Sequence, residues 1–353
     1  MIARRAVLVG TVLVAAVACS GGARDEVRRP RSTSTSSSSE PSSSTTAAPA
    51  PAPSATAIGT HAVGIRTTEL VDASRPTPPN GGAPGSPVRT MPTTIWYPAV
   101  GDPTSAPVPD APGDGAAGSY PLVVFAHGFN NTPGSYADLM TRWASAGYVV
   151  VAPAIPLLNA DAPGGPSHAD YGAANIADMA FVVDQAIHRA GTSGDELELA
   201  DPRHVAVSGH SDGEVLAYAL ALEPCCHDER VGAAVLLAGN LDNARVLPAP
   251  TGVPVLHVMS ERDEYNPYAA SIAFDRAHLP APSYSLTLLA APHGAPFEEA
   301  TDPHFDLVAR STVDFLDLAL KDAPDGEARL DADVAAHRDL GTLESRLSKP
   351  AAP

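Results

Sequence analysis

The sequence predicts an α/β fold in which a mostly parallel sheet is covered by helices on both faces. Short apolar runs of strand length recur between Leu122 and Leu289, and intervals long enough for a helix separate them. This alternation is typical of parallel sheets, because parallel neighbours need a crossover connection. The chain has 353 residues, 44% of them hydrophobic, which is enough for a sizeable core.

The expected elements follow from length, branching and periodicity. Strands are predicted at Val63–Val71, Thr90–Tyr97, Leu122–Ala126, Tyr148–Ala152, Val205–Ser208, Ala233–Ala238, Val255–Met259 and Leu286–Leu289. Helices are predicted at Pro133–Ala146, Asn175–Arg189 and Glu214–Leu222. In the second of these helices, apolar residues recur every three or four positions, which predicts one buried face.

Residues 1–18 have the features of a bacterial export leader. Arg4 and Arg5 give a positive start, an apolar run extends to Val17, and small residues precede Cys19. The run is too short for a permanent membrane span. Because Ala16-Val17-Ala18-Cys19 resembles a lipobox, we expect Cys19 to be lipidated and the chain to be a membrane-anchored lipoprotein outside the cytoplasm. A secretory leader cut nearby, which would release a secreted protein, is the alternative.

Composition divides the remaining chain into three parts. Residues 19–57 are dominated by Ser, Thr, Pro and Ala, and such a segment cannot bury enough apolar surface to fold, so we expect a disordered tether. Residues 58–321 form the predicted folded domain. Residues 322–353 are expected to be a polar, solvated C-terminal tail.

The charge balance excludes one class of partner. Lys and Arg number 22 against 40 Asp and Glu, giving a formal net charge of −18. Nucleic-acid binding needs clustered cations, so we expect no nucleic-acid partner and favour an uncharged or cationic small substrate.

The three cysteines, Cys19, Cys225 and Cys226, cannot form a disulfide framework. Neighbouring cysteines pair only in a strained ring, so we expect Cys225 and Cys226 to be a thiol pair without a catalytic role. A vicinal disulfide in an oxidising compartment is the alternative.

The strongest motif is Gly209-His210-Ser211-Asp212-Gly213, which lies between a predicted strand and a predicted helix. A serine on a sharp strand-to-helix turn is held with its hydroxyl exposed, and small residues on both sides permit the turn. This context predicts that Ser211 is a nucleophile.

A serine nucleophile needs a base and an acid that orients the base. His293 follows the last predicted strand, and Asp263 follows the strand before it, in the chain order expected for this motif. We therefore expect Ser211, Asp263 and His293 to form a catalytic triad. For the acid, Asp242 also follows a strand, and Glu261 and Glu264 are further alternatives.

Two backbone N–H groups are candidates to stabilise the oxyanion that forms during acyl transfer. One belongs to Asp212, directly after the nucleophile, and the other to Phe129, in the loop after strand Leu122–Ala126. We further hypothesise that the Asp212 carboxylate disfavours anionic substrates.

The other polar residues near these motifs have a structural interpretation. His127 and His210 are expected to shape their turns, and His257 to be a core histidine. His168 and Asp170 are two ligand types without a third, so we expect a loop on the substrate side and no metal site.

Residues 58–320 resemble the α/β-hydrolase superfamily, and within it the dienelactone hydrolase-like group that includes chlorophyllase, polyester hydrolases and platelet-activating-factor acetylhydrolase. The resemblance rests on the serine motif and on three segments, Val63-Gly64-Ile65-Arg66, Thr94-Ile95-Trp96-Tyr97-Pro98 and Tyr120-Pro121-Leu122-Val123-Val124-Phe125-Ala126-His127-Gly128. The chain departs from the pattern at Glu214 and Asp212, which affects substrate choice more than mechanism.

The resemblance implies a carboxylic ester hydrolase that works through an acyl-enzyme and needs no cofactor. A small-molecule or polymeric ester is the expected substrate, and the short connection between Ala238 and Val255 leaves little room for a lid. The alternatives are a peptidase or acyltransferase with the same triad, and a non-catalytic ligand-binding envelope lipoprotein.

Overall fold

The computed structural model describes residues 59–103, 105–241 and 246–347. The predicted leader with Cys19, the predicted tether and Asp242 lie outside these ranges. The described strands form one ten-stranded sheet in the order β10-β9-β8-β7-β6-β4-β5-β2-β1-β3. The strands are β1 (Ala62–Asp72), β2 (Arg89–Ala99), β3 (Val108–Pro109), β4 (Tyr120–Ala126), β5 (Val149–Pro153), β6 (Ala200–His210), β7 (Val231–Leu237), β8 (Val255–Ser260), β9 (Ser283–Leu288) and β10 (Gly341–Arg346).

The centre of the sheet is parallel, as the sequence predicts. The strands β5, β4, β6, β7, β8 and β9 pair in parallel, while β2, β1 and β10 extend the sheet with antiparallel pairs. This arrangement is the α/β-hydrolase fold. The chain passes from β4 to β5 on one side and then returns to β6 on the other, which makes the β4–β6 pair the switch point where ligands of open parallel sheets bind.

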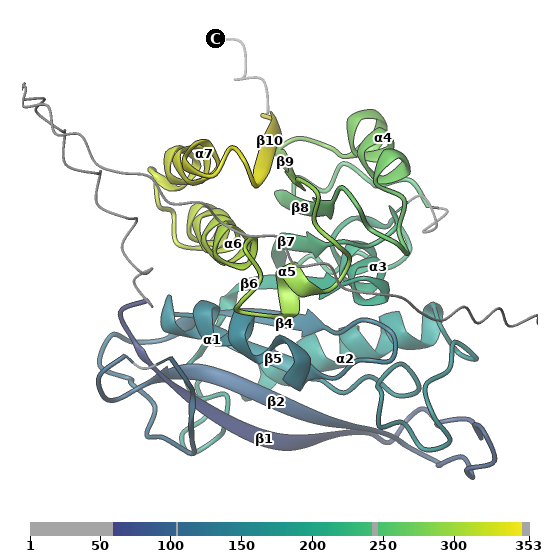
Figure 1. Cartoon of the computed structure of the whole chain (residues 1–353). Coiled ribbons are helices and arrows are strands. Elements are labelled where there is room, and N and C mark those ends of the chain that lie inside the picture. Colours follow the sequence, from purple (N-terminus) through teal and green to yellow (C-terminus); the bar gives the residue numbers. More distant parts are fainter. Residues whose placement is uncertain (1–58, 104, 242–245, 348–353) are drawn as a thin grey trace, which may run out of the picture. The chain divides into compact units, whose positions relative to one another are not determined.

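Helices cover both faces of the sheet (Figure 1). They are η1 (Pro133–Tyr136), α1 (Ala137–Ser145), α2 (Ala173–Arg189), α3 (Asp212–Leu222), α4 (Tyr268–His278), α5 (Ala295–Glu298), α6 (Phe305–Leu320) and α7 (Gly326–Ala336). Buried side chains of α2, α3 and α4 belong to one hydrophobic core, and those of α1, α5, α6 and α7 to a second core on the opposite face. Because both faces are covered, all seven residues of β4 are buried.

The fold continues beyond the boundary predicted at residue 321. The helix α7 buries Leu330 and Val334, and β10 pairs with β9 along six residues, from Gly341 to Arg346. Residues 322–347, the described part of the predicted tail, are therefore not simply solvated. The buried positions are few and widely spaced in a polar segment, which is why composition alone does not reveal them.

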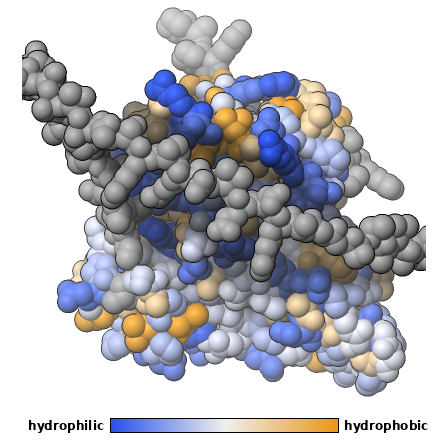
Figure 2. Space-filling view, viewed as in Figure 1, coloured by the Kyte–Doolittle hydropathy of each residue, from blue (hydrophilic) through white to orange (hydrophobic). Residues whose placement is uncertain are grey.

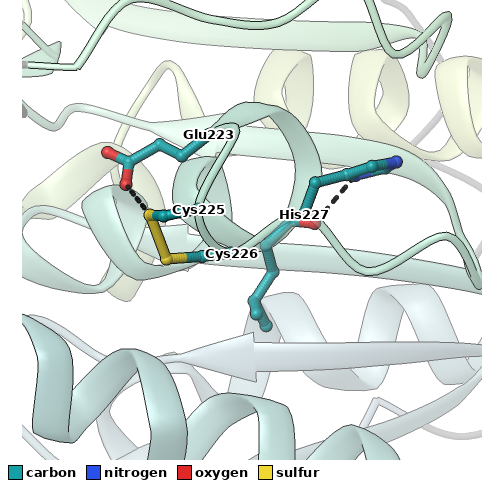
Figure 3. The surroundings of a disulfide bond; sticks show 5 residues. Glu223, Cys225, Cys226 and His227 are labelled. Atoms are coloured by element: carbon teal, nitrogen blue, oxygen red, sulfur yellow. Dashed lines mark hydrogen bonds between the residues drawn. A yellow bond between two sulfur atoms is a disulfide. The ribbon is translucent and has the colours of Figure 1, made fainter.

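The two neighbouring cysteines form a disulfide in a turn after α3 (Figure 3). The backbone N–H groups of Cys226 and His227 both donate to the Glu223 carbonyl oxygen, and this tight turn holds the two cysteines. The vicinal disulfide, which was the alternative, thus replaces the expected thiol pair. The turn lies at the end of α3 opposite Ser211, away from the predicted nucleophile.

Hydrophilic and hydrophobic residues are interspersed on the face of the molecule shown in Figure 2. Among the described helices, none is both long and apolar enough to cross a bilayer.

Candidate active site

Ser211 occupies the sharp turn between β6 and α3. Its backbone has φ 56° and ψ −122°, a conformation that residues with a side chain rarely adopt. A Cβ on Gly209 would lie 2.1 Å from the Gly213 carbonyl oxygen, and one on Gly213 would lie 2.2 Å from that of Ala126. The two glycines of the motif are therefore a steric requirement of the turn.

A chain of hydrogen bonds links the three residues predicted to act together. The Oγ of Ser211 lies 2.9 Å from Nε2 of His293, and Nδ1 of His293 lies 2.7 Å from Oδ2 of Asp263. Because the carboxylate accepts the proton on Nδ1, Nε2 is free to accept from the serine hydroxyl. The arrangement suits a serine whose proton is removed by a histidine.

The loop after β8 positions the acid. The other oxygen of Asp263, Oδ1, accepts the backbone N–H groups of Tyr265 at 2.9 Å and Asn266 at 2.7 Å. The alternative acids in this loop bind backbone: Glu264 accepts from the N–H of His293, and Glu261 from that of Ala290. Asp263 is thus the carboxylate at the His293 ring, while Asp242 lies outside the described residues.

His127 and His210 are fully buried beneath the serine turn, where they bind the surrounding chain. His127 accepts the N–H of Ile155 at Nε2, and His210 contacts the Tyr136 hydroxyl and the His293 carbonyl oxygen. Burial lowers the pKa of His127 to about 4 and that of His210 to about 3. Both rings therefore stay neutral near pH 7, as expected for residues that shape turns.

The two predicted oxyanion donors lie on loops that meet at the serine. A Cβ on Gly128 would be only 3.1 Å from Cβ of Ser211, so the loop after β4 runs directly past the nucleophile. Asp212 is the first residue of α3, where a backbone N–H has no partner within the helix. In the described part of the chain, no acceptor faces the N–H of Phe129 either. Both donors are available to a ligand.

A small pocket opens at Ser211. It has a volume of about 90 Å³ and is lined by Tyr171, Asp212, Val215, Asn240 and Asn266 in addition to the serine. A larger, mainly apolar cavity of about 530 Å³ lies among the loops after β1, β4 and β5, and its lining does not include Ser211. Size alone favours the larger cavity as a ligand site, but the reactive groups identify the smaller one.

His168 and Asp170 do not converge on a common point. Nε2 of His168 lies 2.5 Å from Oδ2 of Asp212, whereas Asp170 binds the buried Arg89 guanidinium at 2.7 Å. Their loop does lie beside the pocket, through Tyr171. Among the described residues, three possible metal ligands come close together at Glu223, Cys225 and Cys226, where the disulfide occupies both sulfurs.

A buried ionic network lies below the site. Nδ1 of His257 is 2.8 Å from Oδ1 of Asp275, and its Nε2 is 3.2 Å from Oε1 of Glu214. Burial alone would lower the pKa of His257, but the two carboxylates raise it well above 6.5. His257 is thus a core histidine, as expected, and it carries a charge. The network gives Glu214, which departs from the family pattern, a structural partner.

Sequence reasoning did not select Tyr171, Asn240 and Asn266, which line the pocket at Ser211. Tyr171 donates from its hydroxyl to the Asp212 carbonyl oxygen at 3.1 Å, and Asn266 donates to that of Ala238 at 2.7 Å. Each residue lies in a loop without periodic pattern. Asn240 and Asn266 lie just after β7 and β8, and Tyr171 lies at the end of the loop that joins β5 to α2. Location in loops that follow parallel strands is the signal that could have drawn attention to them.

Three comparisons relate the chain to known proteins. Residues 108–238 match the chlorophyllase family, a segment that includes Phe129 and Ser211 but ends before Asp263 and His293. Chlorophyllase-1 from Arabidopsis thaliana is 33% identical over 106 residues, which is 30% of this chain and 30% of that protein. The structure is similar to ferulic acid esterase from Streptomyces cinnamoneus, with a TM-score of 0.55, 24% identity, and coverage of 77% of this chain and 92% of the other. The last likeness supports the fold.

Proposed function

We propose that this protein is a serine esterase that hydrolyses carboxylic esters through an acyl-enzyme. The observation that carries the proposal is the continuous chain of hydrogen bonds from Ser211 through His293 to Asp263. The structural likeness to a ferulic acid esterase, whose name denotes a protein that acts on esters, supports an ester as the substrate, and the sequence likeness to chlorophyllase-1 agrees with a hydrolase.

In the proposed reaction, Oγ of Ser211 attacks the ester carbonyl carbon and its proton passes to Nε2 of His293. The carbonyl oxygen becomes an oxyanion, which the N–H groups of Phe129 and Asp212 stabilise. His293 then gives the proton to the leaving alcohol, and the acyl group stays on Ser211. Water repeats the sequence and releases the acid, while Asp263 holds the imidazole in the required tautomer.

The small pocket supports a preference for short acyl groups. A volume of about 90 Å³ is well below the roughly 300–1,000 Å³ of sites that enclose drug-sized ligands. An acetyl group fits such a space, whereas an octanoyl chain must extend along the surface. We therefore expect acetate esters, or esters presented on exposed polymers, to react faster than long-chain triglycerides.

We also propose that the enzyme acts outside the cytoplasm and that a lipid attached to Cys19 anchors it to the membrane. The positive start, short apolar run and lipobox-like residues of the leader support this placement. The Cys225–Cys226 disulfide favours the same compartment, because disulfides persist where conditions are oxidising. Loss of the membrane-bound fraction in Cys19→Ala would support the anchor, and an unchanged fraction would refute it.

Fluorophosphonate labelling of the full chain, followed by p-nitrophenyl acetate and octanoate turnover, tests the activity. The wild type should react with the probe and should hydrolyse the acetate ester faster than the octanoate ester. The Ser211→Ala variant should neither react with the probe nor hydrolyse either ester. His293→Ala should label at least 100-fold more slowly. A folded wild type that neither labels nor turns over would refute the proposal and favour a ligand-binding protein.

A further inference from the structure

The side chain of His168 lies between the two residues whose N–H groups face the proposed oxyanion. Its ring stacks on that of Phe129, with centroids 3.9 Å apart and planes inclined by 16°. On the other side, its Nε2 lies 2.5 Å from Oδ2 of Asp212. One residue therefore bridges the loop after β4 and the first turn of α3.

The loop that carries His168 is fixed independently of these two contacts. The N–H of Ser167 donates to the Leu157 carbonyl oxygen at 2.7 Å. Two residues beyond His168, Asp170 binds Arg89, which is 2% exposed. Because both sides of His168 are held, its ring is a fixed support for Phe129 and Asp212.

The same loop also reaches the backbone of Asp212. The hydroxyl of Tyr171 donates to the Asp212 carbonyl oxygen at 3.1 Å, and the rings of His168 and Tyr171 meet edge to face with centroids 5.3 Å apart. Both the side chain and the main chain of Asp212 are thus tied to one loop. This loop contributes no residue to the chain from Ser211 to Asp263.

We propose that His168 is a positioning residue that sets the spacing of the two oxyanion donors. This inference rests on the proposed function. The Phe129 stack fixes one donor loop, and the Asp212 contact fixes the start of α3. His168 is half exposed and touches neither Ser211 nor His293, so its effect passes through Phe129 and Asp212.

The expected fall in kcat on replacing His168 is estimated from how much oxyanion donors contribute to catalysis. Removing one such donor lowers kcat by roughly 100- to 1,000-fold, because fixed dipoles aimed at the developing charge need no reorganisation. Loss of the support should misplace the donors without removing them. We therefore expect a 10- to 100-fold fall in kcat for His168→Ala with KM changed less than threefold.

The experiment uses the full chain and two readouts. The first is p-nitrophenyl acetate hydrolysis, and the second is the Kd of phenylboronic acid, which adds to a serine hydroxyl to give a tetrahedral anion without any turnover. The variants are His168→Ala, His168→Phe, which keeps the stack and loses the Asp212 contact, and Ser211→Ala. The control is His188→Ala, which removes an exposed histidine from α2.

In His168→Ala, kcat should fall and the boronate Kd should rise by a similar factor, with unchanged Tm. His168→Phe should lie between this variant and wild type, and His188→Ala should match wild type. Normal Ser211-dependent turnover with an unaltered boronate Kd in His168→Ala would overturn this inference and leave the esterase intact. If the wild type hydrolyses no ester but binds the boronate, and this binding is weakened in Ser211→Ala and in His168→Ala, the proposed function is refuted and the positioning role is supported. Boronate binding that does not need Ser211 would overturn the positioning role.

Discussion

Replacement of His257 by leucine removes the cation from between two buried carboxylates. The side chains of His257 and Glu214 are 0% exposed and that of Asp275 is 2% exposed, so water cannot compensate the remaining charges. Breaking a buried ion pair by removing one partner costs about 3–5 kcal/mol. For a folded part of this size, that loss lowers Tm by about 5–10 °C.

Urea denaturation measures the free energy of unfolding directly. Trp96 and Trp143, the two tryptophans of the chain, are fully buried, so their fluorescence reports loss of the core. The matched control is His188→Leu, which makes the same replacement at an exposed position of α2 and should change stability by less than about 0.5 kcal/mol.

The same network predicts a pH dependence. Because the folded pKa of His257 lies well above 6.5, its contribution is complete below pH 6.5 and is lost as pH rises through the folded value. Between pH 7.5 and 9 the wild type should therefore lose stability as pH rises, by no more than about 1.4 kcal/mol per pH unit. Asp314, His127 and His210, whose pKa values are also shifted, titrate below this window. Burial raises the pKa of Asp314 to about 7 and lowers those of His127 and His210 to about 4 and about 3.

Two results would refute the reasoning about the network. A His257→Leu protein that loses less than about 1 kcal/mol at pH 6 would mean that the carboxylates are neutral or solvated. A wild-type stability that is flat or rising between pH 7.5 and 9 would mean that His257 is not charged in the folded protein.

Three further variants probe the site and the domain boundary. Asp263→Asn should lower kcat by about 1,000- to 10,000-fold with little change in KM, because the His293 tautomer is no longer fixed; equal activity would remove Asp263 from the triad. Gly128→Ala places a Cβ 3.1 Å from that of Ser211 and should lower kcat at least tenfold in a p-nitrophenyl acetate assay. Unaltered kinetics would show that the loop after β4 can move to accommodate the methyl group. Leu330→Ala should cost about 2–5 kcal/mol in urea denaturation, and a neutral result would detach α7 from the core.

The sequence predicts the central strands well, because strands buried on both faces must be apolar throughout. All seven positions of β4 and all six of β8 are buried, and both strands stand out from their surroundings as apolar runs. The strand β9 is also buried throughout, but its first half reads Ser-Tyr-Ser, so the predicted run Leu286–Leu289 covers only its second half. By contrast, β10 reads Gly-Thr-Leu-Glu-Ser-Arg and buries only its first residue fully, so no pattern marks it. Edge strands and surface helices depend on what they pack against, which local sequence does not contain.

For the candidate site, chain order predicts which catalytic residues meet, whereas the conformation of the surrounding loops cannot be predicted from sequence. The positions of Ser211, Asp263 and His293 after successive strands are sufficient to expect them at one edge, where their hydrogen bonds join them. The contact of His168 with Asp212 depends on the path of an irregular loop between β5 and α2. Asp212 and Glu214 both depart from the family pattern, and both have ionic partners that a linear sequence cannot reveal.

The two borders of the sheet bear on self-association. Unpaired N–H and C=O groups on a long border strand invite another chain to add a strand, a route to aggregates. Here one border is β3, with only two residues, the second a proline without N–H, and the other is β10, where Glu344 pairs with Arg276. Deleting the chain after Leu340 would expose β9, whose six residues are all buried. The charged edge strand would then be replaced by an unpaired strand that can pair with another chain.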